Sequence, residues 1–322
     1  MKTRILAGLA LAAAGAFSSA RADTYPSHPI YMVLGYEAGG PTDVIARIVA
    51  RYMSMSLHQS VIVENKPGAS ASIAASYVMR APPDGYTMLV TSLTLNVNPL
   101  LYPDRYNYDP IKSFEPVGNF ANNPMVLVTH YNSPYKSVAD LVKDAKATPD
   151  KLTFGSSGVG GSAHLAAEML ANEAGIKMTH VPFKGNAPAL QEAVAGRISF
   201  MFYPSVGIAN LVAGKQLRVL AVGSSKPRPD FPGVPTMDSL GYTGFEQGAP
   251  WVGMLAPAGT PRDIIDTLNK AAVEALDKPE VRQQLADLGA VVVADSPDQF
   301  RKFLIEDKAR WEKVIRQGNV KP

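Results

Sequence analysis

Apolar and polar positions along the chain fall into blocks that predict strands followed by helices. Residues 30–36 form a short apolar run that contains a glycine, a pattern typical of a buried strand. Beyond Pro41, apolar residues recur at i, i+3, i+4, i+7 and i+8 from Ile45, which is the spacing of one apolar helix face. The same rhythm continues to the end of the chain. It predicts an α/β fold with largely parallel sheets.

Further elements follow from the same patterns. Strands are predicted at 61–63, 87–91, 125–129, 152–154, 179–183, 198–202, 217–222, 252–256 and 291–293. Helices are predicted at 70–80, 137–146, 162–174, 187–195, 206–213, 261–277 and 297–317.

Two stretches interrupt this rhythm. Residues 96–123 are rich in Asn, Pro and Tyr and are predicted to form a long connection, and residues 226–235 hold four prolines. We interpret them as crossings between two lobes, with hinges near 119–125 and 223–228. One lobe is predicted to comprise 23–122 plus 225–322 and the other 123–224. Each lobe is predicted to be a mostly parallel sheet flanked by helices.

The first 22 residues carry the features of a cleavable signal peptide. Lys2 and Arg4 precede 13 apolar residues, and Ala20-Arg21-Ala22 supplies a small-x-small cleavage pattern. Thirteen residues at ~1.5 Å each are too short to cross a ~30 Å bilayer core. We therefore expect cleavage after Ala22 and a soluble mature protein in the periplasm.

The composition excludes several functional classes. The chain has no cysteine, so disulfides, thiolate nucleophiles and Cys-ligated metals are ruled out. Beyond the signal peptide, basic and acidic residues balance at 28 each, whereas nucleic-acid binders usually show a basic excess. The five histidines lack i, i+4 spacing and the acidic residues lack calcium-loop spacing. We expect a small-molecule partner, no nucleic acid, no metal and no cofactor.

Two glycine-rich turns each lie between a predicted strand and a predicted helix, at 36–43 and 155–164. The free N–H groups and the dipole of a helix N-terminus make such a turn an anion site. Either turn alone could be an ordinary tight turn with a cap. One in each lobe predicts a ligand cleft between the lobes, outside the carboxyl ends of the strands.

Enzymatic alternatives fit the second turn poorly. Its match to the dinucleotide pattern, Gly158-x-Gly160-x-x-Ala163, has no acidic residue at the end of the next strand. The P-loop and G-x-S-x-G motifs do not occur. Ser162 and His164 are two residues apart on one helix and do not face each other, which argues against a secreted α/β hydrolase.

An ordered set of short motifs spans the mature chain. These motifs are Tyr25-Pro-Ser-x-Pro-Ile30, Gly39-Gly-Pro-Thr-Asp43, Val63-Glu-Asn-Lys-Pro-Gly-Ala69, Ala81-Pro-Pro-Asp-Gly-Tyr-Thr87, Ser157-Gly-x-Gly-x-Ser-x-His164, His180-Val-Pro-Phe-Lys-Gly185, Leu255-Ala-Pro-Ala-Gly-Thr-Pro261 and Arg310-Trp-x-Lys-Val314. Together they resemble the tripartite tricarboxylate transporter solute receptors, the Bug-type proteins.

The resemblance implies a two-lobed, type II-like periplasmic binding protein that closes on its ligand. It implies a monomeric receptor, not an enzyme, that delivers a small organic carboxylate to a two-component integral membrane permease. An alternative role is a ligand sensor that docks on a signalling receptor. The ligand would be held by backbone amides, hydroxyls and water rather than by arginine. Matching by position, the implied ligand-binding residues are Tyr36, Glu37, Ala38, Gly39, Thr42, Asp43, Ser92, Ser157, Gly158, Ser162, His164, Phe183, Lys184, Gly185 and Tyr203.

Two of these residues depart from the family pattern and bear on the ligand. Glu37 stands where the family commonly has an uncharged residue, and a like charge ~5 Å from a carboxylate costs ~3 kcal/mol at an effective dielectric near 20. Glu37 is therefore expected either to face solvent or to accept a hydrogen bond from an N–H or cationic group of the ligand. Tyr203 stands where family members often carry Asp. An aromatic wall there would make an aromatic carboxylate a candidate beside a dicarboxylate.

Overall fold

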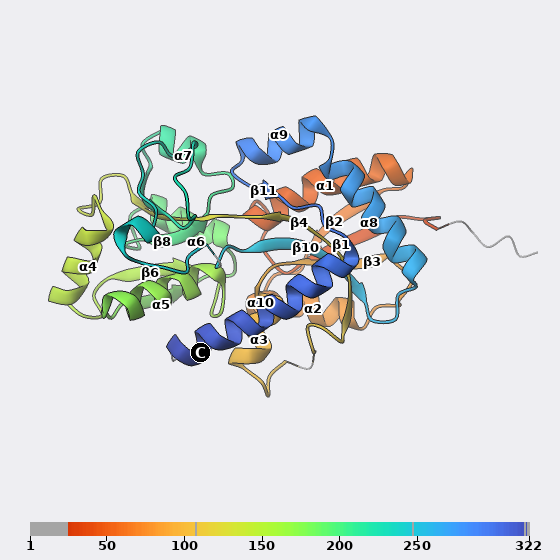
Figure 1. The fold of residues 1–322 in the computed structure, drawn as a ribbon, viewed down its shortest axis with the longest axis horizontal. Helices are drawn as coiled ribbons and strands as arrows, with labels where there is room; N and C mark the ends of the chain where they lie inside the picture. The colour runs from red at the N-terminus through yellow and green to blue at the C-terminus, as the bar shows by residue number, and fades with distance from the viewer. Residues whose placement is uncertain (1–24, 107, 247, 319, 321–322) are drawn as a thin grey trace, which may run out of the picture.

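The computed structural model describes residues 25–106, 108–246, 248–318 and 320. The predicted signal peptide, 1–22, lies outside the described residues. Within the described part of the chain, no helix is long and apolar enough to span a membrane. The helices and strands form two α/β groups, one around each of two sheets (Figure 1).

The first lobe is built on a six-stranded sheet. Its strands are β1 (Ile30–Leu34), β2 (Val61–Asn65), β3 (Thr87–Thr91), β4 (Phe114–Asn122), β10 (Trp251–Pro257) and β11 (Val291–Val292), in the order β11-β4-β10-β3-β1-β2. Because side chains alternate between the faces of a strand, Ile30, Met32 and Leu34 pack against α1 (Pro41–Leu57) and α8 (Arg262–Leu276). Val33 points to the opposite face, which is covered by α2 (Ser72–Met79), α3 (Thr94–Leu101) and α10 (Pro297–Gly318).

The second lobe is built on β5 (Met125–His130), β6 (Thr153–Ser156), β7 (Thr179–Pro182), β8 (Met201–Pro204) and β9 (Leu217–Val222). Strands pair in the orders β8-β5-β9 and β6-β7, and a bridge between Phe154 and Phe200 joins the two parts. Helices α4 (Val138–Ala147) and α5 (Ser162–Ala174) pack on one face. Helices α6 (Asn186–Val194) and α7 (Ala209–Ala213) pack in the hydrophobic cluster on the other face.

The two sheets share one strand order. The first reads β2-β1-β3-β10-β4 before its short edge strand, and the second reads β7-β6-β8-β5-β9. In the first sheet the antiparallel strand β10 lies next to β3, and in the second the antiparallel strand β5 lies next to β8. Each of these two strands comes directly after the chain has crossed from the other lobe. The α/β fold is confirmed, but the sheets are mixed rather than mostly parallel. The antiparallel strands β5 and β10 come from the crossings, which carried no directional signal in the sequence.

The predicted loop at 96–123 is wrong, because this stretch contains most of α3 and all of β4. Its Asn-rich composition concealed the helix, whose buried Asn96 donates through Nδ2 to Leu304 O and to Asp307 Oδ2 on α10. Pro99 inside α3 and the register shifts between β4 and β10 further weakened the periodic pattern. The helix α9 (Pro279–Asp287) was also not predicted.

The two crossings lie side by side. β4 passes into β5 through Asn123, whose N–H donates to Pro250 O just before β10, at 2.8 Å. The proline-rich segment after β9 stays with the second sheet, because Met237 N donates to Val222 O at 2.8 Å and Phe245 lies in that core. These contacts keep residues 231–245 with the second sheet, whereas the predicted division at 224/225 and hinge near 223–228 assigned them to the first lobe, and they put the second crossing near Pro250. The boundary at 122/123 stays a prediction.

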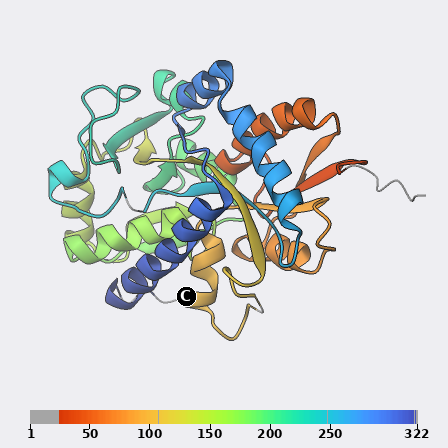
Figure 2. The same cartoon turned by 45° about the vertical axis from the view of Figure 1, so that its right-hand side comes forward.

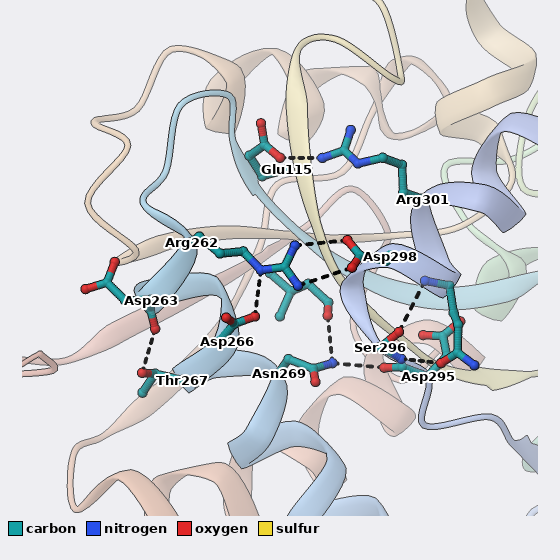
Figure 3. Close-up of polar contacts among 12 residues, drawn as sticks. Glu115, Arg262, Asp263, Asp266, Thr267, Asn269, Asp295, Ser296, Asp298 and Arg301 are labelled. Carbon is teal, nitrogen blue, oxygen red and sulfur yellow. Dashed lines mark hydrogen bonds and ion pairs between the residues drawn. The ribbon is translucent and has the colours of Figure 1, made fainter.

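Figures 1 and 2 show β4 and β10 running between the two groups, and α10 crossing from the first lobe toward the second. A polar network fastens α10 and α8 to β4 (Figure 3). Arg262 bonds Asp266 and Asp298, Arg301 pairs with Glu115, and Asn269 Nδ2 donates to Asp295 O at 2.9 Å. The ion pairs are largely exposed, so each contributes only ~0–1 kcal/mol to stability.

Candidate functional site

Both predicted glycine turns occupy the junctions expected for them. The first connects β1 to α1 and the second connects β6 to α5. Glycine occupies the N-cap position of each helix, at Gly40 and Gly161, and among the described residues no side chain caps either helix. Gly39 N of the first turn is bonded to Asp43 Oδ2, whereas the N–H groups of the first helical turn of α1 have no backbone acceptor within their own helix and can donate to a ligand.

Four helix N-termini converge on one small inner cavity of about 20 Å³. The wall includes Thr42 of α1, Thr94 of α3, Ser162 of α5 and Asn186 of α6, so each lobe contributes two helices. The inner cavity is lined by Tyr36, Pro41, Thr42, Ser92, Leu93, Thr94, Asn123, Ser157, Ser162, Asn186, Pro204 and Pro250. Its volume is of the order of one or two waters, which suits a single small polar group.

Polar atoms on this wall lack internal partners. Ser92 Oγ, Asn123 Oδ1 and Asn186 Oδ1 are buried and have no hydrogen-bond partner within the described part of the chain. An unsatisfied buried polar group costs about 1–3 kcal/mol, and a bound polar ligand would recover part of that cost. Asn side chains can turn to present either the oxygen or the amide, so these groups suit both a carboxylate and a hydroxyl.

The electrostatics of the inner cavity favour an anion. Every residue on its wall is uncharged. Each helix N-terminus carries roughly half a positive charge from its aligned peptide dipoles, and the first turns of four helices line the same small volume. An anion there would meet backbone N–H groups and hydroxyls rather than a guanidinium or ammonium group.

A wider outer cavity of about 730 Å³ adjoins the inner one through Ser157, which lines both. That volume is in the range of small-molecule sites. The outer cavity is lined by Glu37, Ala38, Gly68, Ala69, Ser70, Ser157, Gly158, Pro182, Phe183, Lys184, Ala187, Pro188 and Gln191. Its wall therefore carries one acidic and one basic side chain together with apolar surface.

Most of the predicted ligand-binding residues line one of the two cavities. Tyr36, Thr42, Ser92, Ser157 and Ser162 line the inner cavity. Glu37, Ala38, Ser157, Gly158, Phe183 and Lys184 line the outer cavity. Gly39, Asp43, His164, Gly185 and Tyr203 line neither.

Asp43 braces the first turn. Its carboxylate accepts hydrogen bonds from Gly39 N, Arg47 Nε and Asn65 Nδ2, each at 2.9 Å. Burial acts to raise the pKa of Asp43, but these hydrogen bonds outweigh it and hold that pKa below its usual range. Asn65 also donates to Tyr36 O, so the turn is tied to β2 at two points.

His164 plays the same bracing role in the second turn. Its Nδ1 accepts from Gly160 N at 3.1 Å, and its ring stacks on His180 with centroids 4.1 Å apart. Burial, reinforced by the neighbouring His180, lowers the pKa of His164 to about 3. Burial also lowers the pKa of His180 to about 4. Both rings are therefore neutral at pH 7.

His180 supports the turn through Ser156. Ser156 Oγ donates its single proton to Gly158 O at 2.9 Å and accepts from Gly158 N at 3.1 Å. The 2.6 Å contact between Ser156 Oγ and His180 Nε2 must then have His180 as the donor. The two imidazoles thus fix residues 156–160 of the second glycine turn through hydrogen bonds to Ser156 and Gly160.

The expected aromatic wall at Tyr203 is wrong. Tyr203 is 3% exposed and packs in the core with Val126, Val128 and Met201. Side chains alternate along β8, and Met201 and Tyr203 share the face that packs in this core, so Tyr203 lines neither cavity. Pro204, at the end of the same strand, lines the inner cavity in its place.

Glu37 does not face solvent alone, which was one of the two placements expected for it. It is half-buried and lines the outer cavity. Gly185 lies against it from the second lobe, since a Cβ built on Gly185 would lie 3.4 Å from Glu37 Cβ. Glu37 thus sits where the two lobes meet at the outer cavity.

Sequence reasoning missed several residues of the inner cavity. Asn186 had a usable signal, because it follows Gly185 between a predicted strand and a predicted helix, as in the two glycine turns. Asn123 and Pro250 had none, since they lie in the crossings and reach the site only through the tertiary fold. Among the described residues, no cluster of His, Asp and Glu could hold a metal ion.

Residues 45–320 match the model of a family described as "Tripartite tricarboxylate transporter family receptor". The structure of the periplasmic binding protein BugD is 33% identical, covers 92% of this chain and 99% of its own, and superimposes with a TM-score of 0.88.

Two other similar structures contain ligands. Rpa4515 of Rhodopseudomonas palustris, solved with adipate, is 33% identical over 92% of this chain and 99% of its own, with a TM-score of 0.88. MatC of R. palustris, solved with bound malate, is 31% identical over 90% of this chain and 100% of its own, with a TM-score of 0.85.

Proposed function

The chain belongs to the tripartite tricarboxylate transporter receptor family, whose members are binding proteins rather than enzymes, and we propose that it is a periplasmic receptor for a small aliphatic dicarboxylate. The observation that carries this proposal is the inner cavity, where four helix N-termini from two lobes surround an uncharged polar pocket. Such a pocket recognises a carboxylate through N–H groups and hydroxyls.

The size of the two cavities supports a ligand with a compact anionic head and an extended remainder. The inner cavity accommodates one carboxylate, and the outer cavity accommodates a short chain with a second polar end. Adipate and malate, found in two of the similar structures, both have this form. An aromatic ligand loses its support, because Tyr203 lies in the core.

The receptor role extends to delivery. Membership of this family supports transfer of the bound acid to a two-component integral membrane permease, with residues 1–22 directing export to the periplasm. The ligand-loaded chain should co-purify with such a permease, and the ligand-free chain should do so less.

A thermal-shift screen of the mature chain tests the binding proposal. Malate, adipate and other aliphatic dicarboxylates are compared with benzoate and with uncharged diols of similar length. At 100-fold over Kd, binding adds ~2.7 kcal/mol, which is a few degrees of Tm for a chain of this size. Calorimetry should then give one site per chain. A broad screen of acids that shifts nothing would refute the receptor proposal.

A further inference from the structure

A turn at residues 68–71 has an unusual backbone and no role so far. It begins in the Val63-to-Ala69 motif, which contributed no residue to the predicted site. Ala69, Ser70 and Ala71 all have positive φ, at 46°, 51° and 71°, and follow Gly68 at 128°. Residues with a Cβ rarely adopt this left-handed region, and consecutive ones more rarely still. Such conformations persist only where their surroundings hold them, often at ligand clamps.

The first lobe holds this turn on one side. Ser70 O accepts from Asn98 Nδ2 of α3 at 2.8 Å, and Ser72 N donates to Ala69 O. Ala71 lies directly against Gly35 at the start of the first glycine turn, where a Cβ on Gly35 would overlap it. The turn is therefore fixed to the segment that carries Tyr36 and Thr42.

The second lobe meets the same turn on the other side. Ser70 Oγ donates to Val159 O at 2.7 Å, and Val159 lies in the second glycine turn. Gly158 approaches so closely that a Cβ there would lie 2.9 Å from Ser70 Oγ. Gly160 likewise lies against Val97 and Leu101 of α3. Glycine at 158 and 160 permits this approach, and Ser70 supplies a directed hydrogen bond across the cleft.

The position of this bond relates it to the ligand. Gly68, Ala69 and Ser70 line the outer cavity together with Ser157 and Gly158. The bond thus forms at the wall of the site, beside the junction of the inner and outer cavities. It can exist only while the two glycine turns face each other.

We propose that Ser70 is a positioning residue of the ligand site, and that its hydrogen bond to Val159 O stabilises the closed arrangement of the lobes. Ser70 acts through the second glycine turn rather than on the carboxylate. This proposal rests on the proposed function for its ligand, but the bond itself needs no ligand. A neutral hydrogen bond of this kind shifts the closed-to-open ratio by ~3–10-fold. Apparent affinity follows the population of the binding-competent state.

Distance measurements between spin labels test the proposal directly. The chain has no cysteine, so a label pair can be placed by Met55→Cys on α1 and Lys143→Cys on α4, both at exposed positions. The closed fraction is measured without ligand and then with malate and with adipate as probes. The test variant is Ser70→Ala. The matched control is Ser72→Ala, because the partners of Ser72 Oγ, Asn98 and Tyr108, both belong to the first lobe.

Ser70→Ala should lower the closed-to-open ratio ~3–10-fold and weaken binding of whichever acid binds by up to the same factor, whereas Ser72→Ala should leave the ratio unchanged. Ser70→Gly should lower the closed-to-open ratio as Ser70→Ala does. It should unfold at a higher temperature than Ser70→Ala, because glycine tolerates positive φ. An unchanged ratio in Ser70→Ala, equal losses in both serine variants, or a wild-type chain with no closed population would overturn the proposal. A chain that closes but binds no acid would refute the receptor proposal alone.

Discussion

The backbone N–H of Gly160 donates to Nδ1 of His164, 3.1 Å away and one turn inside the helix that follows the second glycine turn. The bond requires a neutral imidazole with its proton on Nε2, which faces Glu168 Oε1 at 3.7 Å. Protonation of Nδ1 would set two donors against each other. The second glycine turn therefore depends on keeping His164 neutral.

This dependence predicts a loss of stability in acid. In the unfolded chain both histidines titrate near ~6.5, whereas in the folded chain burial lowers the pKa of His164 to about 3 and that of His180 to about 4. Between these values the unfolded chain binds protons that the folded chain does not, so stability falls as pH drops below about 6.5. Denaturant unfolding at pH 7, 6, 5 and 4 measures the slope.

Substitutions of single titratable residues identify the groups that cause this dependence of stability on pH. His164→Gln and His180→Gln should each flatten it by up to one proton. Asp295→Asn should steepen it, because burial raises the pKa of Asp295 to about 6 and its protonated form adds stability that is lost as pH rises toward 6. Equal slopes in wild type and both histidine variants would contradict the bracing role of the imidazoles.

The hydroxyls at the helix N-termini should contribute directly to binding. Ser162→Ala and Thr42→Ala each remove a donor on the wall of the inner cavity. We expect each to weaken carboxylate binding by ~0.5–3 kcal/mol while the fold survives. Thr267→Ala is the control, since Thr267 lines neither cavity and its Oγ1 donates to Asp263 O within α8 (Figure 3). If calorimetry finds both site variants at wild-type affinity, the ligand binds elsewhere.

Glu37 should discriminate between ligands by charge. It lines the outer cavity, where the far end of a dicarboxylate would lie. Glu37→Gln removes a like charge and should strengthen dicarboxylate binding by ~0.5–2 kcal/mol for charges several ångströms apart. A monocarboxylate of the same length should change less. Lys184→Gln should instead weaken dicarboxylate binding, because it removes a positive charge from the same cavity. If Glu37→Gln changes the affinities of the dicarboxylate and the monocarboxylate equally, the far carboxylate lies outside this cavity.

Tyr203 should affect folding rather than ligand choice. Tyr203→Asp places a carboxylate without a partner in the core beside Val126 and Val128, which costs several kcal/mol or forces its protonation. Tyr203→Phe keeps the packing and should bind every tested acid as the wild type does. Thermal unfolding of the two variants, followed by titration of Tyr203→Phe, separates the roles. A change in ligand preference in Tyr203→Phe would show that the Tyr203 hydroxyl contacts the ligand and would contradict its place in the core.

Local signals in the sequence predicted the strands and helices around both glycine turns. The apolar run at 30–36 and the helix face from Ile45 are short-range patterns, and both appear in the structure as β1 and α1. The stretch 96–123 escaped because α3 is stabilised by distant partners, such as Asp307 for its buried Asn96. Periodicity cannot report a bond across more than 200 residues.

The residues of the site likewise fall into those that have a local signature in the sequence and those that only the tertiary fold brings together. Thr42 and Ser162 could be predicted, because a helix N-terminus after a glycine turn has a local signature. Asp43 and His164 carry the same signature, yet their hydrogen bonds to Gly39 N and Gly160 N turn them into braces. Asn123 joins the inner cavity only because two crossings meet there. Contacts of that kind are set by the fold and not by spacing.

A crystal structure of the mature chain with the tightest-binding acid of the screen tests the central claim most directly. The account predicts one carboxylate in the inner cavity, within hydrogen-bond distance of N–H groups at the starts of α1 and α5, with no arginine or lysine touching it. The rest of the ligand should extend past Ser157 into the outer cavity. A carboxylate held instead by Lys184, or a ligand bound outside both cavities, would contradict the account.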